Sequence, residues 1–255
     1  MNLRRIESLQ NPQYKLWEAT LESRGLKKHG RFILAGRKSV PEALARWPGR
    51  FEAVLTHDGA LLDRWTLPDN VPAYELSWKL FDFLDVSGTR APLLVGIVPE
   101  MPMADLSLPP RGLELIVPLG DPANLGALLR SAAAFGVARV ILTEEAAHPF
   151  NPKCLRASAN APFSLDLYRG PALAGLAKAA PMGPIVALEG KGEDLTRFDW
   201  PRDIRLVIGE EGQGVPATLD VPRLAVPTSD AVESLNATVA ASLALYGHWL
   251  RHRAT

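Results

Sequence analysis

The chain has 255 residues, and its 28 basic and 28 acidic side chains give a formal net charge of zero. This length allows one large domain or two smaller ones, and it is sufficient for a buried core. The single cysteine, Cys154, excludes an internal disulfide and a CxxC metal site, and without a membrane-length apolar run or the apolar core of a signal peptide we expect a cytoplasmic protein.

The first hundred residues predict a small α/β unit. Helical spacing of apolar residues begins at Pro12 and predicts a helix to about Gly25. Ser39 is a candidate cap for a short helix, because Glu42 follows three residues later as in a capping box. Strands are expected at residues 32–35, 53–56 and 93–98.

Charge is concentrated at the start of the chain. Residues 1–50 hold eleven Lys or Arg and four Glu, a net charge of +7. Such a basic segment is a candidate for binding a phosphate backbone, although a solvated helical face explains the charge equally well.

A proline-rich stretch separates the two halves of the chain. Residues 99–111 contain four prolines, a composition that suits a linker. We therefore divide the chain into residues 1–98, a linker at 99–111, and a second domain at 112–255.

The second domain alternates strand-like and helical patterns. This alternation predicts an α/β fold with a mostly parallel sheet covered by helices. Strands are expected at residues 113–119, 139–142, 184–188, 205–208 and 223–226, and helices at 124–135, 171–180 and 235–252.

Three segments in this domain join the end of a strand to a turn or a helix. They are residues 121–130, 207–214 and 226–236. Because an open α/β sheet binds ligands at the carboxyl ends of its strands, three such junctions predict one composite pocket.

The first segment offers an amide and a guanidinium. Asn124 is a candidate helix cap, and Gly136 is placed to end that helix in a left-handed conformation. Arg130 lies among small and apolar residues, where it either finds an acceptor or extends from an amphipathic helix into solvent.

The other two segments offer bare backbone and small polar groups. The turn from Gly209 to Gly214 contains three glycines but matches neither Walker A nor GxGxxG, so a phosphate cradle is not indicated. Asn236 opens a helix rich in small residues and can serve as its cap.

Taken together, these segments resemble the SpoU-type RNA 2'-O-ribose methyltransferases of the SPOUT superfamily. The resemblance rests on N-x-G-x-x-x-R from Asn124 to Arg130, G-x-E-G-x-G from Gly209 to Gly214, and [IV]-P followed by S-L-N at Ser234 to Asn236. Residues 151–158 look like the family's segment between the first two motifs, and the first domain resembles its small substrate-binding domain. Glu210 departs from the family, which usually has Asn or Pro there.

The resemblance implies a trefoil knot in the second domain, a homodimer, and S-adenosylmethionine as cofactor, with no metal. It implies a catalytic role for Arg130, supported by Asn124, Glu211, Ser234 and Asn236. It places the cofactor against Leu188, Gly190, Ile208, Gly209, Val226 and Leu235. Candidate RNA-binding residues in the basic first domain are Lys15, Arg24, Lys27, Lys28 and Arg37.

Other functions stay open at this point. An RNA-binding protein of the same fold that has lost catalysis is the main alternative. A nucleotide-dependent dehydrogenase is disfavoured, because no Gly-rich turn after the first strand is followed by an acid about 20 residues later. Ribosomal RNA and transfer RNA both fit as substrates.

Overall fold

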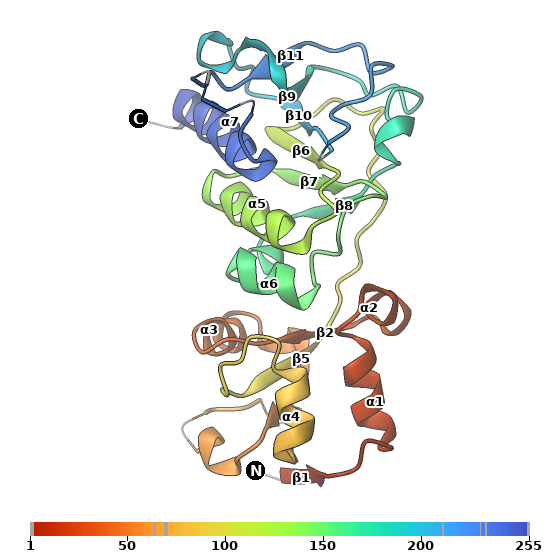
Figure 1. Cartoon of the computed structure of the whole chain (residues 1–255), viewed down its shortest axis with the longest axis vertical. Coiled ribbons are helices and arrows are strands. Elements are labelled where there is room, and N and C mark those ends of the chain that lie inside the picture. Colours follow the sequence, from red (N-terminus) through yellow and green to blue (C-terminus); the bar gives the residue numbers. More distant parts are fainter. Residues whose placement is uncertain are drawn as a thin grey trace. The chain divides into compact units, whose positions relative to one another are not determined.

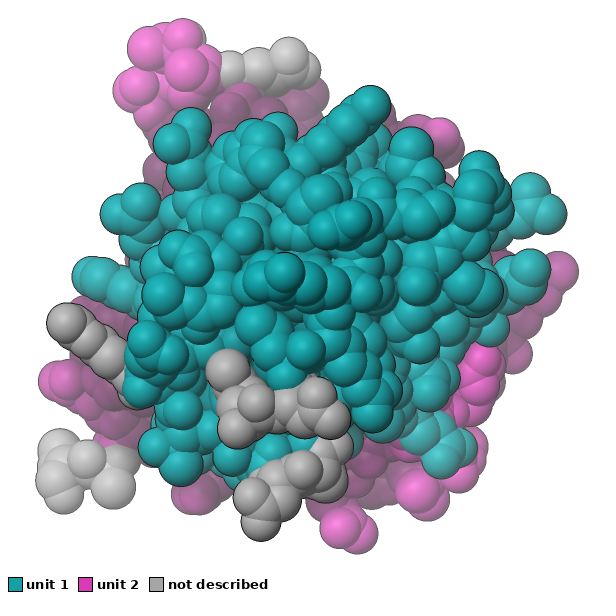
Figure 2. All heavy atoms as spheres, turned by 90° about the horizontal axis from the view of Figure 1, so that it is seen from below, with its two compact units in different colours: residues 1–100, 148–163 teal, residues 101–147, 164–255 magenta. Residues whose placement is uncertain are grey.

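The computed structural model describes residues 3–63, 65–68, 71–210, 212–229, 231–232 and 234–253. The chain divides into two compact units, coloured separately in Figure 2. The first unit contains residues 1–100 and 148–163, and the second contains residues 101–147 and 164–255. The first unit therefore includes a segment from the second half of the sequence.

The first unit is built on a five-stranded mixed sheet with the order β1-β4-β3-β5-β2. β5 runs antiparallel to both of its neighbours, whereas β1, β4 and β3 are parallel. The strands are β1 Leu3–Ile6, β2 Arg31–Leu34, β3 Phe51–Thr56, β4 Ala73–Leu76 and β5 Leu93–Ile97. The helices are α1 Pro12–Ala19, α2 Ser23–His29, α3 Ser39–Arg46, α4 Trp78–Leu84 and α6 Pro152–Ser158.

The single helix predicted from residue 12 to about residue 25 is wrong. The chain breaks after Ala19 and starts again as α2, and the Thr20 hydroxyl donates to the Trp17 carbonyl at 2.7 Å. A Cβ at Gly25 would lie 1.8 Å from the Ala19 carbonyl oxygen, so the backbones of the two helices touch there. Glycine is required by this close approach.

The predicted cap at Ser39 is also wrong. Ser39 is the first residue of α3, the N-cap is Lys38, and no side chain caps the helix there. The capping-box pattern in the sequence is therefore shifted by one residue from the real helix start.

The second unit is built on a six-stranded sheet that is parallel throughout, with the order β11-β9-β10-β6-β7-β8. This confirms the predicted α/β class. α5 and α7 lie side by side along one face of the sheet (Figure 1). The strands are β6 Leu113–Val117, β7 Arg139–Leu142, β8 Leu167–Arg169, β9 Ile185–Asp194, β10 Ile204–Ile208 and β11 Arg223–Ala225, and the helices are α5 Pro122–Ala134 and α7 Ala237–His252.

The predicted helix at residues 171–180 is wrong. The segment forms only a 3-10 turn at Leu173–Gly175, and Ala180 ends it with a left-handed φ of 43°. The Leu173 N–H donates to the Glu145 carboxylate at 3.0 Å, which fixes the turn from outside. Leu173 and Leu176 still pack against the sheet, so the apolar spacing reports burial and not a helix.

The proline-rich segment at residues 99–111 is irregular, and from Met101 onward it belongs to the second unit. The Ala104 N–H donates to the Arg169 carbonyl at 2.8 Å, and Leu106 is buried in the core of this unit. The segment thus covers part of the sheet face opposite α5 and α7.

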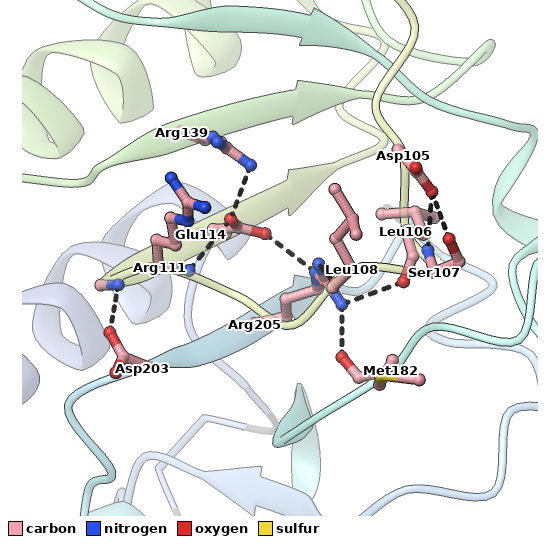
Figure 3. Close-up of polar contacts among 11 residues, drawn as sticks. Asp105, Leu106, Ser107, Leu108, Arg111, Glu114, Arg139, Met182, Asp203 and Arg205 are labelled. Carbon is pink, nitrogen blue, oxygen red and sulfur yellow. Dashed lines mark hydrogen bonds and ion pairs between the residues drawn. The ribbon is translucent and has the colours of Figure 1, made fainter.

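A buried ion pair lies in the middle of this sheet (Figure 3). Arg205 on β10 and Glu114 on β6 are register partners, and their side chains meet at 2.9 Å with 1% of each exposed. The guanidinium also donates to the carbonyls of Leu108, at 2.6 Å, and Met182, at 2.7 Å. Glu114 accepts further from Arg139 at 3.3 Å, so the polar groups of both side chains are well paired.

Removing one partner of this pair is expected to destabilise the protein strongly. Glu114→Ala leaves the Arg205 charge buried without its carboxylate, and we expect a loss of about 3–5 kcal/mol in the free energy of unfolding. Urea denaturation measures it. The control is Arg46→Ala, which removes an exposed pair with Glu42 and should cost less than about 1 kcal/mol. Equal losses in the two variants would contradict the structural role of Glu114.

Candidate functional site

The three predicted segments follow β6, β10 and β11 of one parallel sheet, and β9 lies between β10 and β11. β10 lies between β9 and β6, with Ile208 opposite Leu188 and Val207 opposite Ile116. Because the carboxyl ends of parallel strands lie at one edge of a sheet, the segments after these strands leave from the same edge. A composite pocket requires this arrangement, and the pocket itself stays a prediction.

The helix after β6 begins at Asp121 and not at Asn124. The Asp121 carboxylate accepts from the N–H groups of Ala123 and Asn124 at 2.9 and 2.8 Å, so the predicted cap at Asn124 is wrong. The helix end was predicted correctly, because Gly136 follows it with a φ of 67°. The side chain of Asn124 therefore has a role other than capping its own helix.

Asn124 joins the first motif to the third. The Asn236 amide nitrogen lies 3.5 Å from the Asn124 side-chain oxygen, and the Thr238 hydroxyl donates to the Asn124 carbonyl at 3.0 Å. The Asn236 side-chain oxygen at the same time caps α7, accepting from the Thr238 N–H at 2.9 Å. One amide thus starts a helix and fixes it against the neighbouring one.

Arg130 is exposed on α5, six residues after Asn124. Within the described residues its guanidinium makes no hydrogen bond and no ion pair. Its neighbour Ser131 meets Ser242 of α7 at 2.7 Å between the hydroxyl oxygens, so the helix that carries Arg130 is fixed while the guanidinium is available to an external acceptor.

The glycine-rich turn after β10 is closed by its own backbone. Glu210 and Gly214 exchange two hydrogen bonds, at 3.0 and 2.9 Å. Gly212 and Gly214 have φ values of 93° and 70°, and a Cβ at Gly209 would lie 3.2 Å from the Gly214 Cα. Glycine is needed at these positions for conformation and for close approach. Glu211, a predicted catalytic residue, lies outside the described residues.

A bulge in the pairing of β9 with β11 forms the third part of the site. β11 pairs with β9 at Ala187 and next at Glu193, so residues 188–192 have no partner on β11, although Leu188 still pairs with Ile208 of β10. A Cβ at Gly190 in this bulge would lie 3.6 Å from the Cβ of Ser234. The bulge therefore lies against the third motif.

Glu189 and Arg223 brace these loops, and the sequence analysis missed both. The Glu189 carboxylate accepts from the Val215 N–H at 2.7 Å and lies 3.3 Å from the Arg223 guanidinium. Arg223 donates in turn to the carbonyl of Leu219 at 2.8 Å. The only signal in the sequence is that Glu189 stands between two predicted cofactor residues, Leu188 and Gly190.

The other predicted residues differ in exposure. Leu188 and Ile208 are buried, Val226 and Leu235 are half-buried, and Ser234 and Asn236 are exposed. The five candidate RNA-binding residues all lie in the first unit and all are exposed: Lys15, Arg24, Lys27, Lys28 and Arg37.

The described residues contain no group of three His, Cys, Asp or Glu side chains that could hold a metal ion. Burial raises the pKa of the Cys154 thiol to about 12, as expected for an unreactive cysteine packed in a core. Among the helices of the described residues, none has the length and apolar character needed to cross a membrane.

Comparisons with known proteins agree with this site. A model of the SpoU rRNA Methylase family matches residues 115–246, which include all three segments. The 23S rRNA (guanosine(2553)-2'-O)-methyltransferase of Bacillus subtilis is 30% identical, with 96% of this chain and 98% of that protein covered. A crystal structure of AdoMet-bound rRNA methyltransferase from Sinorhizobium meliloti has the same fold, with a TM-score of 0.78, 21% identity and 99% of each chain covered.

Another relative is longer than this chain. The protein named Ribosomal RNA small subunit methyltransferase G 2 of Syntrophobacter fumaroxidans is 40% identical over 97% of this chain. The chain spans 49% of that relative, about half of its length.

Loss of the Glu189 brace is expected to destabilise the second unit. Glu189→Ala leaves the Val215 N–H without its acceptor and Arg223 without its carboxylate, at an expected cost of about 1–3 kcal/mol in the free energy of unfolding. Glu189→Gln keeps a side-chain oxygen for Val215 and should cost less. Urea denaturation measures the free energy of unfolding of both variants. An alanine variant as stable as the wild type would show that the contacts of Glu189 with Val215 and Arg223 do not stabilise the protein.

Proposed function

Because the chain belongs to the SpoU rRNA methylase family, we propose that it is an enzyme that methylates a ribose 2'-hydroxyl in RNA. The observation that carries the proposal is the contact between Asn124 and Asn236, which joins two motifs. The helix that begins with Asn124 in its first turn also carries Arg130, which has no partner among the described residues. The name of the full-length Bacillus subtilis relative, a 2'-O-methyltransferase of 23S rRNA, supports the reaction and favours ribosomal RNA as the substrate class.

S-adenosylmethionine is the proposed methyl donor, and when bound it supplies an activated methyl group. The residues present fit such a ligand, because three glycines, Gly190, Gly209 and Gly214, place backbone without side chains in the segments at this strand-end edge. We assign the cofactor to the loops that contain Leu188, Gly190, Ile208, Gly209, Val226 and Leu235. Glu189 and Arg223 would hold two of these loops in position.

Arg130 is the proposed catalytic residue. A ribose hydroxyl is a weak nucleophile until its proton leaves, and a guanidinium in a protein stays protonated, so Arg130 acts best as an electrostatic group. It would hold the phosphate beside the target ribose and stabilise negative charge that develops on the 2'-oxygen. Asn124 and Asn236 would position α5, and Ser234 and Glu211 are further candidates for orienting the ribose.

Replacing Arg130 is expected to abolish methyl transfer and spare cofactor binding. For Arg130→Ala we expect a loss of about 100-fold or more in turnover on RNA, since one electrostatic group at a developing oxyanion contributes about that much. Tritium transfer to RNA measures turnover, and calorimetry with S-adenosylmethionine measures binding.

The matched control for this test is Arg202→Ala, an exposed arginine before β10 at the opposite edge of the sheet. Retained turnover of Arg130→Ala would contradict the assigned role. A wild-type protein that binds RNA without transferring methyl groups would support the alternative of an inactive RNA-binding member of the family.

RNA binding is assigned to the first unit. Arg24, Lys27 and Lys28 share one face of α2, and among the described residues none of them has an ion pair. Lys15 and Arg37 are further exposed cations in this unit. Such unpaired charges suit phosphate contacts, which position a nucleic acid without reading its sequence.

A homodimer is also proposed, and α7 supplies its support. Val239, Leu243, Tyr246 and Leu250 follow a helical stripe and are exposed by 49%, 44%, 44% and 45%. A helix face with this much exposed apolar surface marks an interface. A cytoplasmic location agrees with a ribosomal substrate, and the trefoil knot implied by the resemblance stays a prediction.

A charge in this stripe is expected to separate the dimer. Leu243→Glu places a carboxylate in an apolar interface, where it loses its hydration without gaining a partner. Light scattering after size exclusion should give one chain for this variant and two for the wild type. The control Met103→Glu alters an apolar side chain outside α7 that is 59% exposed, more than Leu243, and should stay dimeric. A monomeric wild type would refute the dimer.

A further inference from the structure

α6 is held rigidly in the first unit although its sequence lies between two strands of the second. Its inner face, Pro152, Cys154, Leu155 and Ser158, is buried. The Asn151 side chain caps the helix, and after it the Asn160 amide donates to the Ser39 carbonyl at 2.9 Å. The helix backbone is therefore fixed at both ends.

Aromatic side chains fix the flanks of the same segment. Phe150, before the helix, lies 5.0 Å from Phe32 of β2 between ring centroids. Phe163, after the helix, stacks on Trp47 at 5.2 Å and meets Phe51 at 5.9 Å. Such a cluster leaves α6 little freedom to move within the unit.

The outer face of α6 is cationic and unpaired. Lys153 and Arg156 are three residues apart, share one side of the helix, and are both exposed. Within the described residues neither side chain makes a hydrogen bond or an ion pair. No Asp or Glu stands between Glu145 and Asp166 in the sequence, so the segment has no acid of its own to neutralise them.

A further positive charge lies beside this segment. The pKa of His148 is lowered to about 4, first by burial and then by the charge of Lys27 on α2. Lys27 is therefore close enough to act on the residue that leads into α6. His148 stays neutral at physiological pH and adds no charge.

We propose that Lys153 and Arg156 on α6 bind phosphates of the RNA substrate. The proposal rests on the proposed function and names a surface for its substrate. A preorganised pair of unpaired cations suits two phosphates, because its side chains have no protein partner to give up on binding. This face is additional to the cations Arg24, Lys27 and Lys28 of α2.

The test is the affinity of Lys153→Ala/Arg156→Ala for RNA as a function of salt. The probes are a short fluorescent single-stranded oligoribonucleotide for binding, and total RNA from cells that lack the protein for methyl transfer. We expect about tenfold weaker binding and a slope of log affinity against log salt that is smaller by about 1.4, since two phosphate contacts are lost. KM for RNA should rise about tenfold with little change in kcat, and S-adenosylmethionine should bind as in the wild type.

Two further variants separate charge from structure. Lys153→Arg/Arg156→Lys keeps both charges and should keep RNA affinity. Arg111→Ala/Arg202→Ala removes the same charge from exposed positions at the opposite edge of the second sheet and should leave the salt slope unchanged.

An unchanged salt slope and KM in the α6 alanine variant, with methyl transfer by the wild type intact, would overturn this inference alone. Loss of affinity in the charge-preserving variant would also overturn it, because the effect would then be structural. Absence of methyl transfer by the wild type would instead reject the proposed function.

Discussion

The buried pair of Glu114 and Arg205 is the constraint on which the second unit depends. The two residues face each other across β6 and β10, and the guanidinium reaches the carbonyls of Leu108 and Met182 on covering segments. A slip of one residue between these strands would place one charge on the opposite face of the sheet. We infer that the pair fixes register more than it adds stability, since a buried ion pair offers little net energy over apolar packing. The register matters because β6 leads to Asp121 and β10 leads directly to Gly209. The register between the two strands therefore sets the relative positions of the loops at the carboxyl ends of the strands.

At the carboxyl ends of the strands, the side chain that caps a helix also contacts a residue of another motif. Asn236 starts α7 with its oxygen and contacts Asn124 with its nitrogen. Thr238 and Ser242 continue the polar contact along the two helices, to the Asn124 carbonyl and to Ser131. Asn236 can therefore cap α7 and position the proposed catalytic helix at the same time. Because α5 is held against α7 at Asn124 and Ser131, the helix that carries Arg130 is fixed, and preorganisation of this kind is what electrostatic catalysis requires.

The sequence was sufficient for features that depend on local pattern and insufficient for those that depend on distant partners. The strand-end motifs, the parallel sheet and α7 follow from periodicity, glycine and cap residues, and they were predicted. Asp121 and Asn124 are both good cap residues, and only the backbone decides between them. The apolar residues at 171–180 predict a helix wrongly, because a buried irregular segment has the same hydrophobic content. Arg205 and Glu114 gave no signal, because a charge within a strand does not reveal a partner 91 residues away. The packing of α6 in the first unit depends on contacts with β2 that no local pattern encodes.

The neutral net charge of the chain conceals how its cations are used. In the second unit, arginines such as Arg139, Arg205 and Arg223 are paired with carboxylates and carbonyls that hold the sheet and its loops. In the first unit, the cations on the outer faces of α2 and α6 have no such partners among the described residues. Only an unpaired cation can exchange water and counterions for a phosphate without breaking an internal contact. The basic character relevant to RNA is therefore decided by which cations are unpaired, and the +7 of the first fifty residues is only part of it, because α6 contributes from the other half of the sequence.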